Sequence, residues 1–229
     1  MYAINKKEII EKICNSKYKI ANSPLDYAAY INDYKEEQIY STQKAREILT
    51  TAGWKEEDGN WTLNKEGKKI KLQLNLTICD QNEERILAGE IIKEQLEQIG
   101  IKINVRILPE SIYNQEIENN RYDLLLVGMQ TSFAPELEMY LGKGNLSNYR
   151  NEEIKELIFE MNNIKEEAVL KQKYRQVMNI VENEVPYIGL YFHTKKFMYQ
   201  KNLKGNINPT SNNLFYFIET WYKENYDNK

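Results

Sequence analysis

Residues 69–129 alternate between two hydrophobic periods, and this alternation constrains the fold more than any other feature of the chain. Apolar residues recur at every second position in a half-buried strand and at a spacing of about 3.6 residues in a helix. The patterns predict, in order, strand 69–78, helix 82–100, strand 101–108, helix 110–119 and strand 122–129. Strands separated by helices pair in parallel through right-handed crossovers. The sequence therefore predicts an α/β fold with a mainly parallel sheet.

The flanking segments add helices and a hairpin to this unit. Helical spacing predicts further helices at 5–14, 42–52, 135–142, 151–163 and 166–184. Gly59 and Gly67 each follow an acidic residue between strand-like segments, which predicts a hairpin. Strand 122–129 is mostly apolar, as in strands that are covered on both faces. From the alternation of strand and helix periods we expect helices 83–99, 151–163 and 166–184 to flank the sheet.

Composition excludes several classes of protein. The net charge is -3, and Lys and Glu are interleaved along the predicted helices. Nucleic-acid binding needs clustered cations, so we expect no nucleic-acid partner. No apolar run reaches the roughly 18 residues of a membrane span, and the N-terminus lacks the layout of a signal peptide. Two cysteines, Cys14 and Cys79, are too few for a disulfide scaffold or a zinc site. They could form one bridge or remain two unpaired thiols.

Local constellations for catalysis are absent from the sequence. His193 is the only histidine, so no Ser–His, Cys–His or histidine–metal arrangement is suggested. Adjacent acids such as Glu83 and Glu84 diverge on a helix, and no glycine-rich phosphate motif occurs. Aromatic residues are abundant instead, with 17 Tyr, and tyrosine suits the recognition of polar ligands in a cleft. We therefore expect a binding protein without a cofactor or a metal, and not an enzyme.

Sequence landmarks occur in the order of a known family. The chain opens on MYAINKKEIIEKI, continues through ANSPL and carries the pattern A..IL..AGW from Ala45 to Trp54. Later come EQLEQIGIKI from Glu94 to Ile103, then IENNRYDLLLVGM, LSNYRNEEIKELIFE and VPYIGLYF. With these landmarks the chain resembles the C-terminal half of the family 5 extracytoplasmic solute-binding proteins. These are the oligopeptide, dipeptide and nickel-type receptors of ABC importers.

The resemblance implies a particular fold and partners. It implies a type II periplasmic-binding-protein-like lobe, with residues 1–190 as the second lobe and 191–229 as a tail that returns across a hinge. The N-terminal lobe, the signal peptide and the lipid anchor would lie outside this sequence. Ligand, a peptide or another small solute, would be enclosed between the lobes by hinge closure. The implied partner is an ABC permease, and the implied location is extracytoplasmic, on a membrane-attached lipoprotein.

The resemblance also implies where the solute binds. The loop after the third strand would form one wall, through Met129, Gln130, Thr131, Ser132 and Phe133. Family members often carry there an acid that pairs with a peptide α-amino group, and some carry an Arg on the strand before it for a carboxylate. Here the counterparts of the acid are Ser132 and Ala134, and the counterpart of the Arg is Leu126. Recognition by shape, by Phe133 and by neutral hydrogen bonds is therefore expected, unless Asp80 or an acid of the other lobe substitutes.

Two further loops are expected to face the same cleft. Asp80, Gln81 and Asn82 follow the first strand of the sheet, and Asn22 and Ser23 resemble a ligand-proximal loop of the family. Because the carboxyl ends of parallel strands share one edge, we expect Asp80–Asn82 to lie beside Met129–Phe133. An ordinary helix cap and an ordinary turn are the alternative interpretations of the two loops.

Two other classes of protein stay open. Some cytoplasmic transcription regulators use the same ligand-sensing module, and an upstream DNA-binding domain would distinguish that case from a lipoprotein signal. An unrelated α/β enzyme with a dispersed site is the third possibility, which a turnover screen beside a ligand screen would separate from a binding protein.

Overall fold

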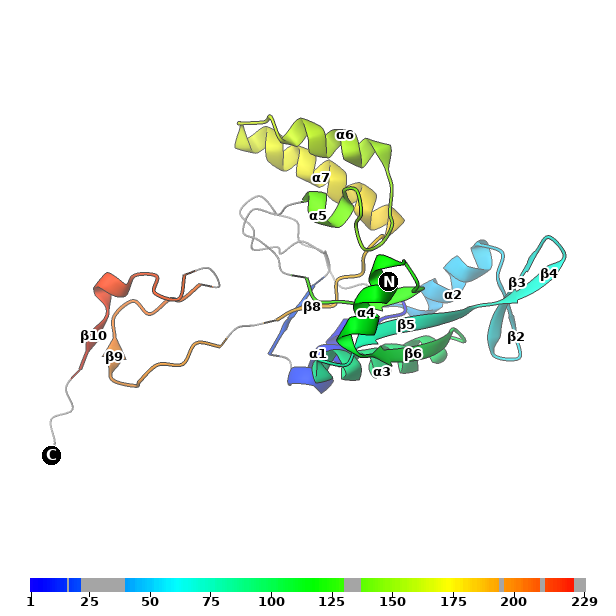
Figure 1. The fold of residues 1–229 in the computed structure, drawn as a ribbon, viewed down its shortest axis with the longest axis horizontal. Coiled ribbons are helices and arrows are strands. Elements are labelled where there is room, and N and C mark those ends of the chain that lie inside the picture. The colour runs from blue at the N-terminus through cyan, green and yellow to red at the C-terminus, as the bar shows by residue number, and fades with distance from the viewer. Residues whose placement is uncertain (16, 22–39, 130–136, 194–195, 211–212, 225–229) are drawn as a thin grey trace. The chain divides into compact units, whose positions relative to one another are not determined.

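The computed structural model describes residues 1–15, 17–21, 40–129, 137–193, 196–210 and 213–224. Internal contacts divide the chain into two units, Met1–Phe192 and His193–Lys229 (Figure 1). The first unit contains the predicted α/β elements. In its described residues, the second contains two short antiparallel strands, β9 (Leu203–Lys204) and β10 (Tyr222–Lys223), and a 3-10 turn at Ile218–Thr220.

A three-stranded parallel sheet organises the first unit. Its strands are β5 (Gln73–Cys79), β6 (Lys102–Leu108) and β7 (Leu124–Leu126), in the order β6-β5-β7. Helix α3 (Glu83–Glu97) connects β5 to β6, and α4 (Glu110–Glu118) connects β6 to β7. Both strand pairs are parallel. The predicted strand–helix–strand–helix–strand order and the parallel sheet are therefore confirmed.

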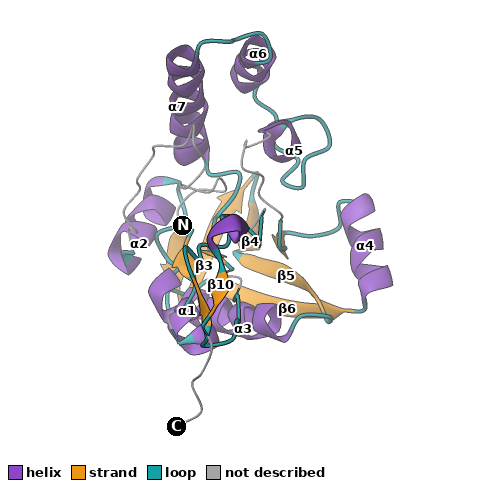
Figure 2. Ribbon diagram, turned by 90° about the vertical axis from the view of Figure 1, so that its left-hand side faces the viewer, coloured by secondary structure: helices purple, strands orange, loops and turns teal. Residues whose placement is uncertain are grey.

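Helix α3 covers one face of the sheet, and α1 (Lys6–Cys14) packs against α3 (Figure 2). Small residues bring α3 close to β5. A Cβ placed on Gly89 would lie 2.1 Å from Cδ1 of Ile78, which is fully buried. The buried residues of this first core are Ala3, Ile4, Ile9, Leu76, Ile78, Ala88, Ile91, Ile92, Leu96, Ile99 and Ile103. The amphipathic pattern of residues 82–100 thus produces the packing that fixes the sheet.

The predicted strand 69–78 is wrong as a single strand. Residues Lys68–Lys71 form β4 of a separate antiparallel sheet, β2-β3-β4, with β2 at Lys55–Glu57 and β3 at Asn60–Lys65. The break falls at Leu72, whose N–H donates to the carbonyl of Trp61, while its own carbonyl accepts from the N–H of Lys102. Leu72 therefore bonds to both sheets, and the alternating pattern continues through a change of partner. The predicted hairpin is present within β2-β3-β4.

Trp61 joins the antiparallel sheet to the first core. Its side chain is only 2% exposed, and its Nε1–H donates to the carbonyl of Ile99 over 2.6 Å. Gly100, at φ +82°, leaves room for the indole, since a Cβ there would lie 3.3 Å from Nε1. The indole N–H of Trp61 thus provides a hydrogen bond to the buried carbonyl of Ile99, at the turn between α3 and β6.

Trp61→Phe is expected to lower the free energy of unfolding by about 1–3 kcal/mol, because it leaves the Ile99 carbonyl without its donor. Denaturant unfolding measures this loss. Trp54→Phe is the matched control, since the Trp54 indole makes no side-chain hydrogen bond within the described part of the chain. Equal losses in the two variants would contradict a role for the Trp61 hydrogen bond.

Three helices form a second core of the first unit. Helices α5 (Leu137–Leu141), α6 (Glu152–Met161) and α7 (Glu167–Glu184) lie side by side (Figure 1). Their buried residues are Leu137, Tyr140, Leu141, Ile154, Leu157, Ile158, Met161, Tyr174, Val177, Met178 and Val181. The helices occur where they were predicted, but the expectation that 151–163 and 166–184 flank the sheet is wrong. Their apolar faces are buried against one another and against α5 instead.

The remaining predictions from sequence agree with the structure in part. Helix α2 spans Thr42–Thr51, and β1 (Lys19–Ile20) pairs antiparallel with β8 (Tyr191–Phe192). Strand β7 is shorter than the predicted 122–129. Cys14 and Cys79 are both free, so the bridge between them is not formed. Within the described ranges, every helix is too short or too polar to cross a membrane.

Candidate solute-binding edge

The carboxyl ends of the three parallel strands meet at one edge of the sheet. Asp80 follows β5, and its N–H donates to the carbonyl of Leu108, the last residue of β6, over 2.9 Å. The register of β5 and β7 pairs Ile78 with Leu126, so Asp80 and Gly128 each stand two residues beyond a paired position. This geometry brings the segments after β5, β6 and β7 to the same edge.

Asp80, Gln81 and Asn82 connect β5 to α3. Gln81 donates from Nε2 to Oδ1 of Asp80 over 2.8 Å, and both residues are exposed. The Asn82 side chain accepts from the N–H of Arg85 over 2.8 Å and is the N-cap of α3. The side-chain oxygen of Asn82 therefore acts as an ordinary helix cap, as the alternative interpretation expected. Asp80 and Gln81 present their polar groups to solvent at the edge.

Arg85 lies against the segment that follows β7. A Cβ on Gly128 would approach Nη2 of Arg85 to 2.7 Å, so the guanidinium occupies the space that a side chain at 128 would need. Arg85 belongs to the first turn of α3, three residues after the Asn82 cap. The contact therefore places the two segments, Asp80–Asn82 and Gly128–Met129, on one edge. The sequence interpretation missed Arg85, because it looked for a cation only on the strand at Leu126.

Three tyrosines surround the first turn of α3. The Tyr18 hydroxyl donates to the carboxylate of Glu84, with distances of 2.8 and 2.9 Å to its two oxygens. The Tyr18 ring stacks on Tyr191, with centroids 5.3 Å apart. Tyr113, on α4, donates to the carbonyl of Leu126 over 3.1 Å. The abundance of tyrosine was the only sequence signal for this group, because its members come from β8, α4 and the residue before β1.

The tyrosine hydroxyls titrate above their ordinary range. Burial and then the hydrogen bond to Glu84 raise the pKa of Tyr18 to about 12. Burial also raises the pKa of Tyr191, where the negative charge of Glu84 adds to the effect and the positive charge of Arg85 opposes it. Burial raises the pKa of Tyr113 as well, although the positive charge of Arg85 opposes this rise. At neutral pH these hydroxyls are protonated and can donate.

Glu84→Gln is expected to lower the pKa of Tyr18, since it removes the charged acceptor but leaves the burial. Because the pKa is raised in the folded state, the stabilisation by Tyr18 is complete below pH 10 and is lost as the pH rises towards about 12. NMR of ring-labelled tyrosine measures the titration. Glu83→Gln, on an exposed neighbour in the same turn, is the control. An unchanged Tyr18 titration in Glu84→Gln would contradict this assignment.

Other predicted site residues have different surroundings or lie outside the described residues. Met129 is partly buried against the α5–α7 core, and Leu126 packs against the first core, as an apolar strand residue does. The following predicted residues fall outside the described ranges: Asn22, Ser23, Gln130, Thr131, Ser132, Phe133 and Ala134. The ligand-binding roles of all the predicted residues stay predictions.

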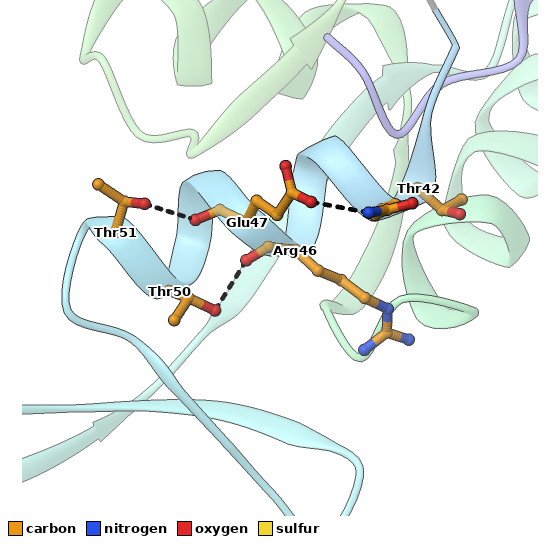
Figure 3. A pocket seen from close by; sticks show the side chains of 6 residues that line it. Thr42, Arg46, Glu47, Thr50 and Thr51 are labelled. Atoms are coloured by element: carbon orange, nitrogen blue, oxygen red, sulfur yellow. Dashed lines mark hydrogen bonds between the residues drawn. The ribbon is translucent and has the colours of Figure 1, made fainter.

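A shallow depression of about 520 Å³ lies elsewhere, along α2 (Figure 3). Most of its polar side chains already have partners, in α2 and, for Arg46, in the Glu56 carboxylate and the Gln98 carbonyl. Thr50 donates to the carbonyl of Arg46, Thr51 to that of Glu47, and Gln43 to the Glu47 carboxylate. These contacts are typical of an exposed helix surface, so the depression offers no group aimed at a ligand. The described residues contain no cluster of three His, Cys, Asp or Glu that could hold a metal ion.

Comparison with known proteins identifies the class and then the family. The fold resembles one part of solved periplasmic binding proteins. One is the oligopeptide-binding protein AppA of Bacillus subtilis in complex with a nonapeptide, at a TM-score of 0.73 and 23% identity over 98% of this chain and 46% of that chain. Another is NikZ of Campylobacter jejuni in complex with Ni(L-His), at a TM-score of 0.73 and 20% identity, covering 97% and 47% of the two chains. The fold is therefore that of a periplasmic-binding-protein-like lobe.

The model of the bacterial extracellular solute-binding proteins, family 5 Middle, matches residues 1–149. The chain belongs to this family. Among curated proteins, it is 27% identical to AppA of Bacillus subtilis (strain 168) over 96% of this chain. It is 22% identical to heme-binding protein A of Haemophilus influenzae over 95%. The chain spans 42% and 40% of the lengths of these two relatives, both of which are binding proteins.

Proposed function

We propose that this chain is one lobe of the substrate-binding receptor of an ABC importer, which binds peptides or related small solutes and closes on them by hinge motion. The family match over residues 1–149 carries the proposal. The carboxyl-end edge supports it, because exposed polar groups, a guanidinium and tyrosines meet where α/β proteins bind small molecules. The solute would lie against Asp80–Asn82 and the segment after β7, and no chemical step is required.

The second lobe of the receptor would bind to this chain as well as to the solute. The unit His193–Lys229 exposes large apolar side chains, among them Met198 at 91% and Phe215 at 59%. Such surface is costly in water and is usually covered. Because the chain spans less than half of its relatives, we propose that this unit is the tail that returns to the other lobe. Receptors of this kind work outside the cytoplasm, and a lipid anchor would belong to the remainder of the receptor.

The test is to purify the complete receptor and identify what it retains. Native mass spectrometry of the folded protein is expected to show a peptide or a small solute that is lost on denaturation. Calorimetry with that solute is expected to show saturable binding at one site, and incubation is expected to leave the solute unchanged. Turnover would favour an enzyme with a dispersed site. A DNA-binding domain encoded upstream would favour a transcription regulator that uses the same module.

A further inference from the structure

Arg85 has no acidic partner among the described residues at the proposed solute-binding edge. Its guanidinium makes no ion pair and no side-chain hydrogen bond with any residue that the structure describes. The residue is partly buried, and its Nη2 is held against Gly128. A guanidinium that is partly removed from water is costly unless an anion or several acceptors replace the water. Among the described residues, Arg85 is therefore a charged donor without an acceptor at the edge where the proposed function places the solute.

The nearby acids already have other donors. The Glu84 carboxylate accepts from the Tyr18 hydroxyl at both oxygens, and the Asp80 carboxylate accepts from Gln81. No acidic group of the described residues lies within ion-pair distance, 4.0 Å, of the Arg85 guanidinium. Adjacent positions on a helix diverge, so Glu84 faces Tyr18 while Arg85 faces Gly128. The anion that completes the Arg85 site would therefore come from outside the described chain.

The Tyr191 hydroxyl is another hydrogen-bond donor near the first turn of α3. The Tyr191 hydroxyl makes no hydrogen bond with the described residues, although its ring is stacked on Tyr18. The positive charge of Arg85 acts on Tyr191 and on Tyr113. Tyr113 already donates to the carbonyl of Leu126, so of these two hydroxyls only that of Tyr191 makes no hydrogen bond with the described residues. The two parallel N–H groups of a guanidinium match the two oxygens of a carboxylate, so Arg85 alone can bind one.

We propose that the Arg85 guanidinium binds a carboxylate of the solute at this edge. The solute is then an acid, either a peptide with a free C-terminus or a molecule with a carboxylate elsewhere. Gly128 takes part by leaving room, since any side chain there displaces the guanidinium. This inference rests on the proposed receptor function, and it supplies a cationic anchor that the sequence pattern at Leu126 does not show.

The test uses the complete receptor and three pools of N-acetylated nonapeptides, the length bound in the solved AppA complex. The first pool has a free C-terminal carboxylate and no acidic side chain. The second is amidated and carries one Glu, and the third is amidated and neutral. Mass spectrometry after ultrafiltration measures the retained amount of each pool. We expect the receptor to retain the first or second pool about ten- to a hundredfold more tightly than the third.

Variants identify the residue responsible. Arg85→Gln is expected to abolish the preference for carboxylate, and Gly128→Ala to weaken it in the same direction. Arg121→Gln removes an exposed arginine that precedes β7, at the opposite end of that strand, and is expected to keep the preference. Thermal unfolding of each variant establishes that it is folded.

Each outcome decides a different point. Equal retention of all three pools by the wild-type receptor would overturn the carboxylate proposal but leave the receptor function standing. A preference that survives in folded Arg85→Gln would show that another residue holds the carboxylate. Retention of none of the pools would overturn both the peptide assignment of the proposed function and the inference built on it. The first and second pools together distinguish a C-terminal carboxylate from a side-chain carboxylate.

Discussion

The isolated 229-residue chain is expected to bind the solute at least about a hundredfold more weakly than the complete receptor, a difference of about 2.7 kcal/mol. Binding sites for small molecules bury most of the ligand surface. If the receptor closes over its solute, this chain supplies one wall, and the contacts of the other wall are lost. Titration calorimetry of the two proteins with the same solute, identified from the complete receptor, measures the difference.

A folded chain is the condition for interpreting this comparison. Circular dichroism and amide hydrogen exchange of the isolated chain are expected to show the protected amides of β5 and β6, which pair along their full lengths. Equal affinities of a folded chain and the complete receptor would mean that residues 1–229 contain the whole binding site. The two-walled cleft would then be wrong, while membership of the family would stand.

The fold was predictable where one local period controls a whole element. Residues 82–100 combine an Asn cap, an apolar stripe and a terminal glycine, and α3 spans Glu83–Glu97 within that segment. The prediction failed at Leu72, because an alternating strand pattern does not say which strand is its partner. Residues 69–71 pair with β3 and residues 73–79 with β6, and both halves show the same alternation. Pairing is a property of the whole chain and not of the segment.

The positions of α6 and α7 were missed for a related reason. An apolar stripe predicts that a helix buries one face, but it does not say against what. A sheet and another helix bury such a stripe equally well. Here Ile154 on α6 and Val177 on α7 are buried within the helical core. The sequence therefore predicted both helices and left their partners open.

The candidate site was predictable only where topology places it. Asp80–Asn82 were found because the loops after parallel strands share an edge, and that rule needs only the order of the elements. Tyr18 and Glu84 are 66 residues apart, and their hydrogen bond depends on the pairing of β1 with β8. Arg85 was missed because a cation was expected only on the third strand, at the position of Leu126. Its contact with Gly128 appears only once β7 is placed beside β5.

Ile78→Ala and Ile154→Ala are expected to lower the free energy of unfolding by about 2–5 kcal/mol each, the largest single effects on stability. Ile78 is 0% exposed in the first core, and Ile154 is 1% exposed in the core of α5, α6 and α7. Each change removes three carbon atoms and leaves a cavity that the neighbouring residues fill only in part. Denaturant unfolding, followed by circular dichroism, measures both losses.

The double variant tests whether the two cores are energetically separate. The buried residues around Ile78 and those around Ile154 belong to different clusters, so the two losses are expected to add to within about 0.5 kcal/mol. The conservative changes Ile78→Val and Ile154→Val are the matched controls and should cost about 0.5–1.5 kcal/mol each. A coupling above about 1 kcal/mol in the double variant would show that the helical core and the sheet core share contacts. Changes in α6 and α7 would then reach the β5 end that carries Asp80.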